Sequence, residues 1–211
     1  MLPGRTWHHR RVAGILNVCT ANRCRSPLAQ LFLAAALGSV AGSPPPPGGI
    51  AVSSAGVWTR GDEPIWPPAG EEARRRGISA SGFRSRPITP ELVQDADLIL
   101  AATRALRDEV VTMVPAALRK TFTWRELAWL LDGVSAAQVP GDTPAERAQS
   151  IAAVAAGRRG HLVAPPGPEL DVEDPVGSTP EALADAADTI LASLLVLTEG
   201  LVPPPRGRHR R

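Results

Sequence analysis

Short, mostly apolar runs alternate with longer amphipathic stretches along this chain. Residues 15–18 and 96–102 are apolar apart from Asn17 and Asp97, which is typical of strands buried on both faces of a parallel sheet. Shorter strands are predicted near 50–54 and 121–124, and helical spacing recurs over residues 28–37, 67–76, 103–113, 126–131, 144–156 and 180–197. Strands that alternate with helices in this way indicate an α/β fold with right-handed crossovers.

The segment between the first predicted strand and the first predicted helix carries reactive side chains. Cys19 follows the strand, Arg25 comes six positions later, and Ser26-Pro27 leads into the helix. Ser26 is predicted to be the N-cap, and Gly38 to end the helix. A loop that enters a helix in this way directs backbone N–H groups and the positive end of the helix dipole to one point. Such a nest binds a phosphate-like dianion and stabilises a thiolate.

This loop resembles that of the bacterial low-molecular-weight protein tyrosine phosphatases, which reads Cys-x-Gly-Asn-x-Cys-Arg-Ser-Pro. The matching residues are Cys19, Asn22, Cys24, Arg25, Ser26 and Pro27. Ala21 stands where the family usually has glycine, and its methyl group is expected to strain or reshape the loop. The resemblance continues through residues 52–56, 76–78, 85–87, 96–100 and 174–175, and covers about 12–131 and 170–200.

The resemblance implies a three-layer sandwich with a four-stranded parallel sheet in the order 2-1-3-4. The phosphate-binding loop would follow the first strand, at the edge where open α/β sheets bind ligands. We expect one phosphatase domain over residues 12–202, between basic tails at 1–11 and 203–211. Residues 132–168 are expected to be a variable insertion, either packed on the domain as an extra helix or forming a mobile lid or partner surface.

Hydrolysis of a phosphate monoester requires charge neutralisation, a nucleophile and an acid for the leaving oxygen. Cys19 is predicted to be the nucleophile, and the planar guanidinium of Arg25 matches two phosphate oxygens. The resemblance implies that Asp174, held by the following proline, is the general acid and later the base, with Asp171 and Glu173 as alternatives. The predicted phosphate-binding residues are Thr20, Ala21, Asn22, Arg23, Cys24, Arg25 and Ser26.

The four histidines, at positions 8, 9, 161 and 209, lie in the terminal tails and the variable region. This placement argues against a Cys–His dyad and against a Cys/His metal site. We therefore expect no metal and no cofactor. Activation of Cys19 would come from the loop dipoles, Arg25 and the Ser26 hydroxyl. Cys24 is expected either to pack under the loop or, as the resemblance implies, to form a reversible disulfide with Cys19.

The expected substrate is phosphotyrosine on a protein, with inorganic phosphate or another oxyanion also able to occupy the loop. Trp58 and Val176 are the candidates for the substrate pocket. Arg23 replaces the aliphatic residue of phosphotyrosine-specific relatives and the threonine of phosphoarginine-specific ones, and is expected at the pocket mouth, where it would favour acidic substrates. The alternatives are a phosphoarginine phosphatase, an arsenate reductase that uses an external small thiol, and a weakly active phospho-ligand binding module.

Charge is distributed unevenly over the 211 residues. The net charge is +2, but residues 1–11 and 205–211 hold seven arginines and no acidic residue, so the remainder carries −5. The arginines of the C-terminal tail have no interleaved aromatic residues, so we expect no nucleic-acid partner. The apolar run 190–197 is too short to span a bilayer, and no signal peptide is recognised. We therefore expect a cytoplasmic protein without membrane association.

Overall fold

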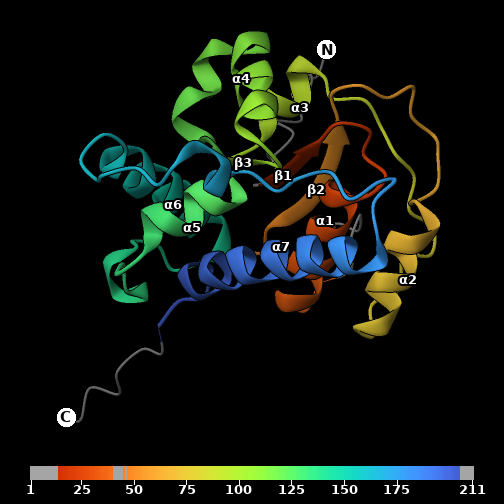
Figure 1. Cartoon of the computed structure of the whole chain (residues 1–211). Helices are drawn as coiled ribbons and strands as arrows, with labels where there is room; N and C mark the ends of the chain where they lie inside the picture. Colours follow the sequence, from red (N-terminus) through yellow and green to blue (C-terminus); the bar gives the residue numbers. More distant parts are fainter. Residues whose placement is uncertain (1–13, 40–44, 46, 205–211) are drawn as a thin grey trace, which may run out of the picture.

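The computed structural model describes residues 14–39, 45 and 47–204, and its centre is a four-stranded parallel sheet (Figure 1). The strands are β1 (Gly14–Cys19), β2 (Ala51–Gly56), β3 (Leu98–Ala101) and β4 (Thr121–Thr123), in the order β2-β1-β3-β4. This confirms the predicted fold class and strand order. The predictions for the basic tails fall outside the described residues, apart from residues 203 and 204.

Seven α-helices and three short 3₁₀ helices are found in the described residues. The α-helices are α1 (Arg25–Ala36), α2 (Pro67–Arg75), α3 (Pro90–Asp95), α4 (Arg104–Met113), α5 (Trp124–Leu131), α6 (Pro144–Arg158) and α7 (Pro180–Leu201). The 3₁₀ helices are η1 (Pro115–Lys120), η2 (Ala136–Gln138) and η3 (Gly167–Leu170). Helices α1 and α7 pack together on one side of the sheet, and α3 and α4 lie on the other (Figure 1).

Helix α1 is buried over residues 25–34, because it lies between the sheet and α7. It ends as predicted, with Gly38 in the left-handed region at φ 64°. Its predicted start is wrong, because the helix begins at Arg25 and Cys24 occupies the N-cap position without a side-chain cap. Ser26 therefore lies inside the first turn, and its hydroxyl is used elsewhere, as described below.

The region 132–168 packs on the domain through α6. Ala148, Ile151 and Ala155 of this helix are fully buried in the hydrophobic core. Arg147 is buried as well, and its guanidinium donates hydrogen bonds only to backbone carbonyls, those of Ala136, Val139, Gly141 and Gly200. The bond to Gly200 attaches the region to the last turn of α7.

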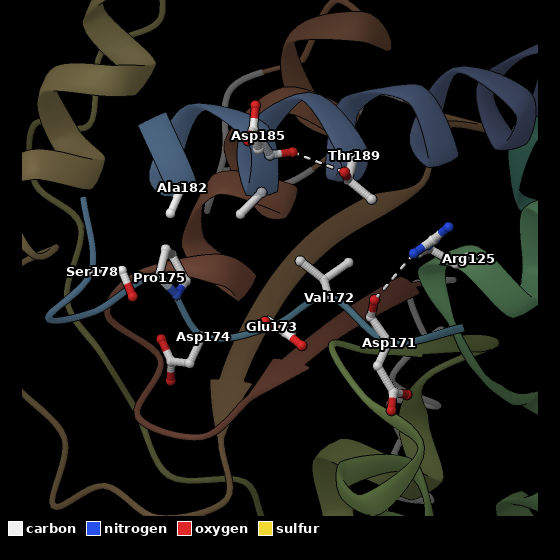
Figure 2. A pocket seen from close by; sticks show the side chains of 11 residues that line it. Arg125, Asp171, Val172, Glu173, Asp174, Pro175, Ser178, Ala182, Asp185 and Thr189 are labelled. Carbon is white, nitrogen blue, oxygen red and sulfur yellow. Dashed lines mark hydrogen bonds between the residues drawn. The ribbon is translucent and has the colours of Figure 1, made fainter. Parts of the chain in front are cut away.

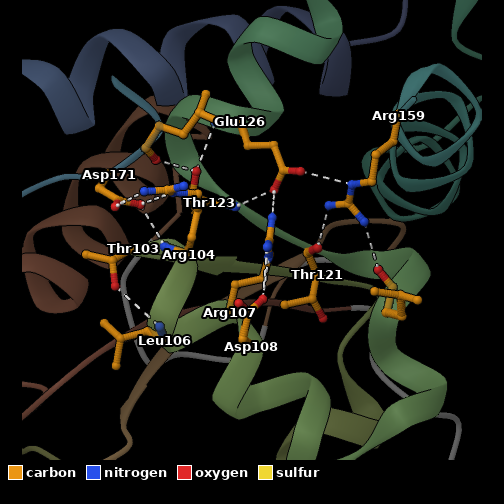
Figure 3. A network of polar contacts seen from close by, with 12 residues as sticks. Thr103, Arg104, Leu106, Arg107, Asp108, Thr121, Thr123, Glu126, Arg159 and Asp171 are labelled. Atoms are coloured by element: carbon orange, nitrogen blue, oxygen red, sulfur yellow. Dashed lines mark hydrogen bonds and ion pairs between the residues drawn. The ribbon is translucent and has the colours of Figure 1, made fainter. Parts of the chain in front are cut away.

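A buried carboxylate fixes the end of α6 to the sheet (Figure 3). Arg159 donates to Oε1 of Glu126 at 2.9 Å and to the carbonyl of Thr121 at 2.9 Å, and its guanidinium lies 4.4 Å from the centre of the Phe122 ring. Glu126 also pairs with Arg107 at 3.2 Å. A buried carboxylate is tolerated where it is paired and hydrogen-bonded in this way. Within the described part of the chain, no helix is both long and apolar enough to cross a membrane.

Candidate active site

The loop between β1 and α1 rests directly on the backbone of β2. An ideal Cβ on Gly56 would lie 2.9 Å from backbone atoms of Thr20, Ala21 and Asn22, so any side chain there would displace the loop. The amide of Val57 donates to the carbonyl of Cys19 at 3.1 Å. The loop is therefore held at the carboxyl end of β1, where the fold was expected to bind its ligand.

Asn22 is the buried centre of this loop. Its backbone is in the left-handed region at φ 54°, which asparagine tolerates better than most residues. Its amide group donates to the hydroxyls of Ser26 at 2.9 Å and Ser54 at 2.8 Å, and its carbonyl accepts from the amide of Arg86 at 2.9 Å. Ala21 is not among the residues with a positive φ, so its methyl group does not stand in the left-handed region, and the expected reshaping of the loop stays a prediction.

The Ser26 hydroxyl donates to the sulfur of Cys19 at 3.0 Å. Both side chains are buried, Cys19 at the end of β1 and Ser26 in the first turn of α1. The hydroxyl of Ser26 is therefore engaged with this sulfur inside the first turn of α1, where it does not serve as a cap. Its predicted part in activating Cys19 stays a prediction.

Arg25 presents an unsatisfied donor on the inside of the loop. The residue is only 4% exposed, and its Nη1 donates to the carbonyl of Val172 at 2.9 Å. Its Nη2 donates to Thr20 Oγ1 at 3.2 Å and to Asp174 Oδ2 at 2.6 Å. Its Nε has no partner, alone among the buried side-chain nitrogen and oxygen atoms of the described residues. A buried donor without a partner is costly, so its presence indicates a missing acceptor.

The backbone of the same loop offers further donors. The amides of residues 21–24 donate to no acceptor among the described residues. These amides belong to a single loop that leads into the N-terminus of α1, where the helix dipole is positive. The loop thus combines unbonded backbone donors and the unbonded Nε of Arg25 with the sulfur of Cys19 at its start.

The segment 171–178 crosses between α7 and the site (Figure 2). Val172 and Pro175 point toward α7, whereas the Asp174 carboxylate points away from it and pairs with Arg25 at 2.6 Å. Asp174 is 46% exposed, so it can exchange protons with solvent. Asp171 is instead held by Arg104, and only Asp174 of the three candidate acids is placed against Arg25.

A cavity of about 340 Å³ lies beside this segment (Figure 2). The residues lining it are Arg125, Asp171, Val172, Glu173, Asp174, Pro175, Ser178, Ala182, Asp185, Ala186 and Thr189. Cys19 is not among them, so the cavity is separate from the thiol and lies between the acid-bearing segment and α7.

Cys24 differs from Cys19 in its environment. The pKa of the Cys24 thiol is raised to about 12, mainly by burial and to a smaller extent by the neighbouring Cys19 and Asp174, while Arg25 opposes the shift. Cys24 is therefore a neutral thiol at physiological pH. Both cysteines are free thiols in the structure.

The three candidates for substrate selection surround the loop at the surface. The amide of Trp58 donates to the carbonyl of Thr20 at 2.8 Å, while its side chain is 70% exposed and its indole N–H donates to Glu109 at 3.1 Å. Val176 is half exposed, and its amide donates to Asp174 Oδ1 at 3.2 Å. Trp58 is thus tied to the Cys19 loop through its backbone amide, and Val176 is tied to Asp174, the partner of Arg25.

Arg23 already has an acidic partner. Its Nη1 lies 3.3 Å from Glu63 Oε1, and its Nε donates to the carbonyl of Pro64 at 3.3 Å. Glu63 therefore offsets much of the positive charge expected to attract acidic substrates. This pairing weakens the basis for assigning Arg23 a part in substrate selection.

Comparison with known proteins places this geometry in a family. A sequence profile described as "Low molecular weight phosphotyrosine protein phosphatase" matches residues 14–130. The chain belongs to this family and is a phosphatase. It is 35% identical over 113 residues to a probable low molecular weight protein-tyrosine-phosphatase, EpsP, of Ralstonia nicotianae, which covers 54% of this chain and 71% of that protein. It is 34% identical over 119 residues to a protein-arginine-phosphatase of Geobacillus stearothermophilus, covering 56% and 74% of the two chains.

Solved structures share the fold. The tyrosine phosphatase Wzb of Escherichia coli K30, in complex with sulphate, superimposes with a TM-score of 0.62 at 20% identity, covering 90% of this chain and 99% of that one. A YwlE mutant from Bacillus subtilis has the same TM-score at 22% identity, covering 90% and 98%. These structures confirm the predicted sheet with its loop after β1.

Proposed function

We propose that this phosphatase hydrolyses phosphotyrosine in proteins through a cysteinyl-phosphate, with the roles assigned to residues as follows. The sulfur of Cys19 attacks phosphorus, and the bond to the leaving oxygen breaks with its electron pair moving to that oxygen. Asp174 donates a proton to it. In the second step Asp174 takes a proton from water, which attacks phosphorus and breaks the sulfur–phosphorus bond.

The unpartnered Nε of Arg25 is the observation that carries this proposal. It faces the same loop as the unbonded amides of residues 21–24, next to the sulfur of Cys19. Charge that spreads over three phosphoryl oxygens is stabilised by donors fixed in place before the reaction. Thr20, Ala21, Asn22, Arg23, Cys24 and Ser26 would contribute through the loop backbone and its supporting bonds.

An aromatic leaving group suits the surface around the loop. Trp58 offers an exposed indole, and Val176 offers an apolar side chain two residues after Asp174. Aromatic contacts are worth about 0.5–1.5 kcal/mol beyond the area they bury, which corresponds to roughly a two- to tenfold preference. Known relatives include both tyrosine and arginine phosphatases, so substrate choice is the property to be tested.

Hydrolysis of peptides of one sequence that carry phosphotyrosine, phosphoserine or phosphoarginine tests the substrate class. We expect kcat/KM to be highest for phosphotyrosine, and Trp58→Ala to lower it by roughly two- to tenfold, through loss of contact with the ring. Leu195→Ala, which removes an exposed apolar side chain of α7, is the matched control and should change nothing. Faster hydrolysis of phosphoarginine would overturn the phosphotyrosine assignment while leaving the phosphatase chemistry intact.

The reversible disulfide between Cys19 and Cys24 is a further part of the proposal, and it makes a prediction about pH. Peroxide converts the Cys19 thiolate to a sulfenic acid, and attack by the Cys24 sulfur then forms the disulfide with loss of water. The attacking form is the thiolate, and the pKa of Cys24 is raised to about 12. At pH values below this pKa, the thiolate fraction of Cys24 increases about tenfold for each unit by which the pH is raised.

We therefore expect disulfide formation after oxidation to be slow at pH 7 and to accelerate strongly toward pH 9. The rate of disulfide formation is measured by mass spectrometry of samples quenched with an alkylating reagent. In Cys24→Ser, peroxide inactivation should no longer be reversed by a small thiol. Equal recovery of the variant and the natural protein would leave Cys24 with a packing role only.

We also propose that residues 12–202 form one domain with 132–168 as an insertion, and that the protein works in the cytoplasm. The core contains residues from Ile15 to Leu201, including α6, which supports a single unit. A catalytic thiol next to a second free thiol suits a reducing compartment.

A further inference from the structure

Asp171, three residues before the proposed acid, is tightly bound to the first residue of α4 (Figure 3). Its Oδ1 accepts from the backbone amide of Arg104 at 2.7 Å and from Nε at 3.3 Å, and its Oδ2 accepts from Nη2 at 3.2 Å. One residue therefore supplies three donors to one carboxylate. A bidentate guanidinium contact of this kind fixes orientation as well as distance.

The remaining bonds of this segment are concentrated next to Asp171. Thr123 Oγ1 donates to the carbonyl of Leu170 at 2.6 Å, and the amide of Val172 donates to the carbonyl of Ala102 at 2.8 Å. Beyond Val172, the hydrogen bonds of this turn are local or to Arg25: the amides of residues 176 and 178 bond within the turn, and Asp174 pairs with Arg25. The position of Asp174 is thus set by its contact with Arg25 and by how the stem at 170–172 is held.

Gly167, which begins η3, supports the guanidinium of Arg104. An ideal Cβ at this position would lie 2.6 Å from Cζ of Arg104, which is closer than side chains approach. The φ of Gly167 is outside the positive range, so alanine would be acceptable to the backbone but would collide with the guanidinium. The end of the region 132–168 thereby touches the residue that holds Asp171.

We infer that Arg104 is a positioning residue for the general acid. Its contact with Asp171, backed by Gly167, sets the place of Asp174 over the Cys19 loop, and the inference rests on the proposed role of Asp174. The side chains of Arg104 and Asp171 are 39% and 22% exposed, and ion pairs so exposed contribute little to global stability. The contact therefore acts mainly on the geometry of the segment.

The variant Arg104→Met tests this inference, because it keeps an unbranched apolar side chain and the backbone amide but removes the guanidinium fork. The quantity to measure is kcat/KM, which reports the first step, in which Asp174 protonates the leaving group. With phenyl phosphate, whose leaving group needs a proton, kcat/KM should fall about ten- to a hundredfold, as for a displaced catalytic group. With dinitrophenyl phosphate, whose leaving group needs little protonation, kcat/KM should change by no more than about threefold. Arg104→Lys should recover part of the loss, and Gly167→Ala should reproduce the pattern of Arg104→Met.

The control Arg74→Met removes a guanidinium and its ion pair with Glu71 on the surface of α2, and should leave both rates unchanged. The double variant Arg104→Met with Asp174→Asn separates the two claims. If Arg104 acts through Asp174, the double variant should hydrolyse phenyl phosphate no more slowly than Asp174→Asn alone. A further loss in the double variant, or equal losses with both substrates in Arg104→Met, would overturn the inference.

Failure of the proposed function has a different signature. If Asp174→Asn itself shows no dependence on the leaving group, the general acid has been assigned wrongly, whatever Arg104 does. If Arg104→Met does not fold, Gly167→Ala and Arg104→Lys carry the same comparison, because both keep a cation at the position. A normal response of Asp174→Asn, combined with unchanged leaving-group dependence in the Arg104 and Gly167 variants, would refute the positioning role alone.

Discussion

Cys19→Ser is expected to lower the hydrolysis of an aryl phosphate by about 10⁴- to 10⁶-fold, the scale of loss seen when a nucleophile is removed. A serine hydroxyl needs a general base, and the Ser26 hydroxyl next to this position donates its proton to the sulfur. None of the histidines in the sequence is adjacent to Cys19 along the chain, and the loop supplies donors rather than acceptors. Steady-state hydrolysis of p-nitrophenyl phosphate measures the loss.

Oxyanion binding should survive in the same variant. Arg25 Nε and the amides of residues 21–24 are untouched by the change, so inorganic phosphate should bind to Cys19→Ser within a fewfold of its affinity for the natural protein. Calorimetric titration with phosphate therefore serves as the folding control. Activity of Cys19→Ser within tenfold of the natural protein would exclude Cys19 as the nucleophile.

Asp174→Asn should lower kcat/KM, which reports departure of the leaving group, by about 10²- to 10⁴-fold for leaving groups of high pKa, the usual contribution of a positioned general acid. The loss should shrink as the leaving-group pKa falls, because a weakly basic oxygen departs without a proton. A series of substituted phenyl phosphates measures the slope. Glu173→Gln, which neutralises the adjacent exposed carboxylate, is the matched control and should retain the slope of the natural protein.

Asp174→Asn should also strengthen the binding of inorganic phosphate. The Asp174 carboxylate lies 2.6 Å from Nη2 of Arg25 and competes with an incoming anion for the guanidinium. Removing its charge should tighten phosphate binding severalfold, and added salt should reduce the difference because the carboxylate is partly exposed. A leaving-group slope lost in Glu173→Gln but kept in Asp174→Asn would assign the acid to Glu173.

The sheet could be predicted from the sequence because its signals are local. The runs at 15–18 and 96–102 are apolar apart from Asn17 and Asp97, as expected of strands covered on both faces. In the same way, Gly38 marks the end of α1. Helix α3 was not predicted, because six residues are too few to show a helical period. Ser26 was assigned wrongly as a cap, since its sequence position is equally suitable for a donor to Cys19 and only the folded loop distinguishes the two.

The part of the site that could be predicted from local sequence is the short motif between Cys19 and Ser26. Cys19, Arg25 and Ser26 lie within eight residues, and their chemistry is readable from that spacing. Asp171, the partner of Arg104, is 67 positions away from it along the chain. Val172, whose carbonyl accepts a hydrogen bond from Arg25, is 147 positions away from Arg25. Neither pairing leaves a periodic or compositional signal in the sequence, because side chains that meet only through tertiary packing follow no local rule.

The distance along the chain between Arg25 and Val172 has a consequence for biosynthesis. These residues are separated by 147 positions, and a ribosome that adds about 5–20 residues per second needs roughly 7–30 s to make that stretch. During this interval the nascent chain already contains its thiol and its guanidinium, but the segment bearing Asp174 has not been translated. Arg147 must also wait for the carbonyl of Gly200, so the emerging polypeptide can assemble this arrangement only after residues up to about 200 have been translated.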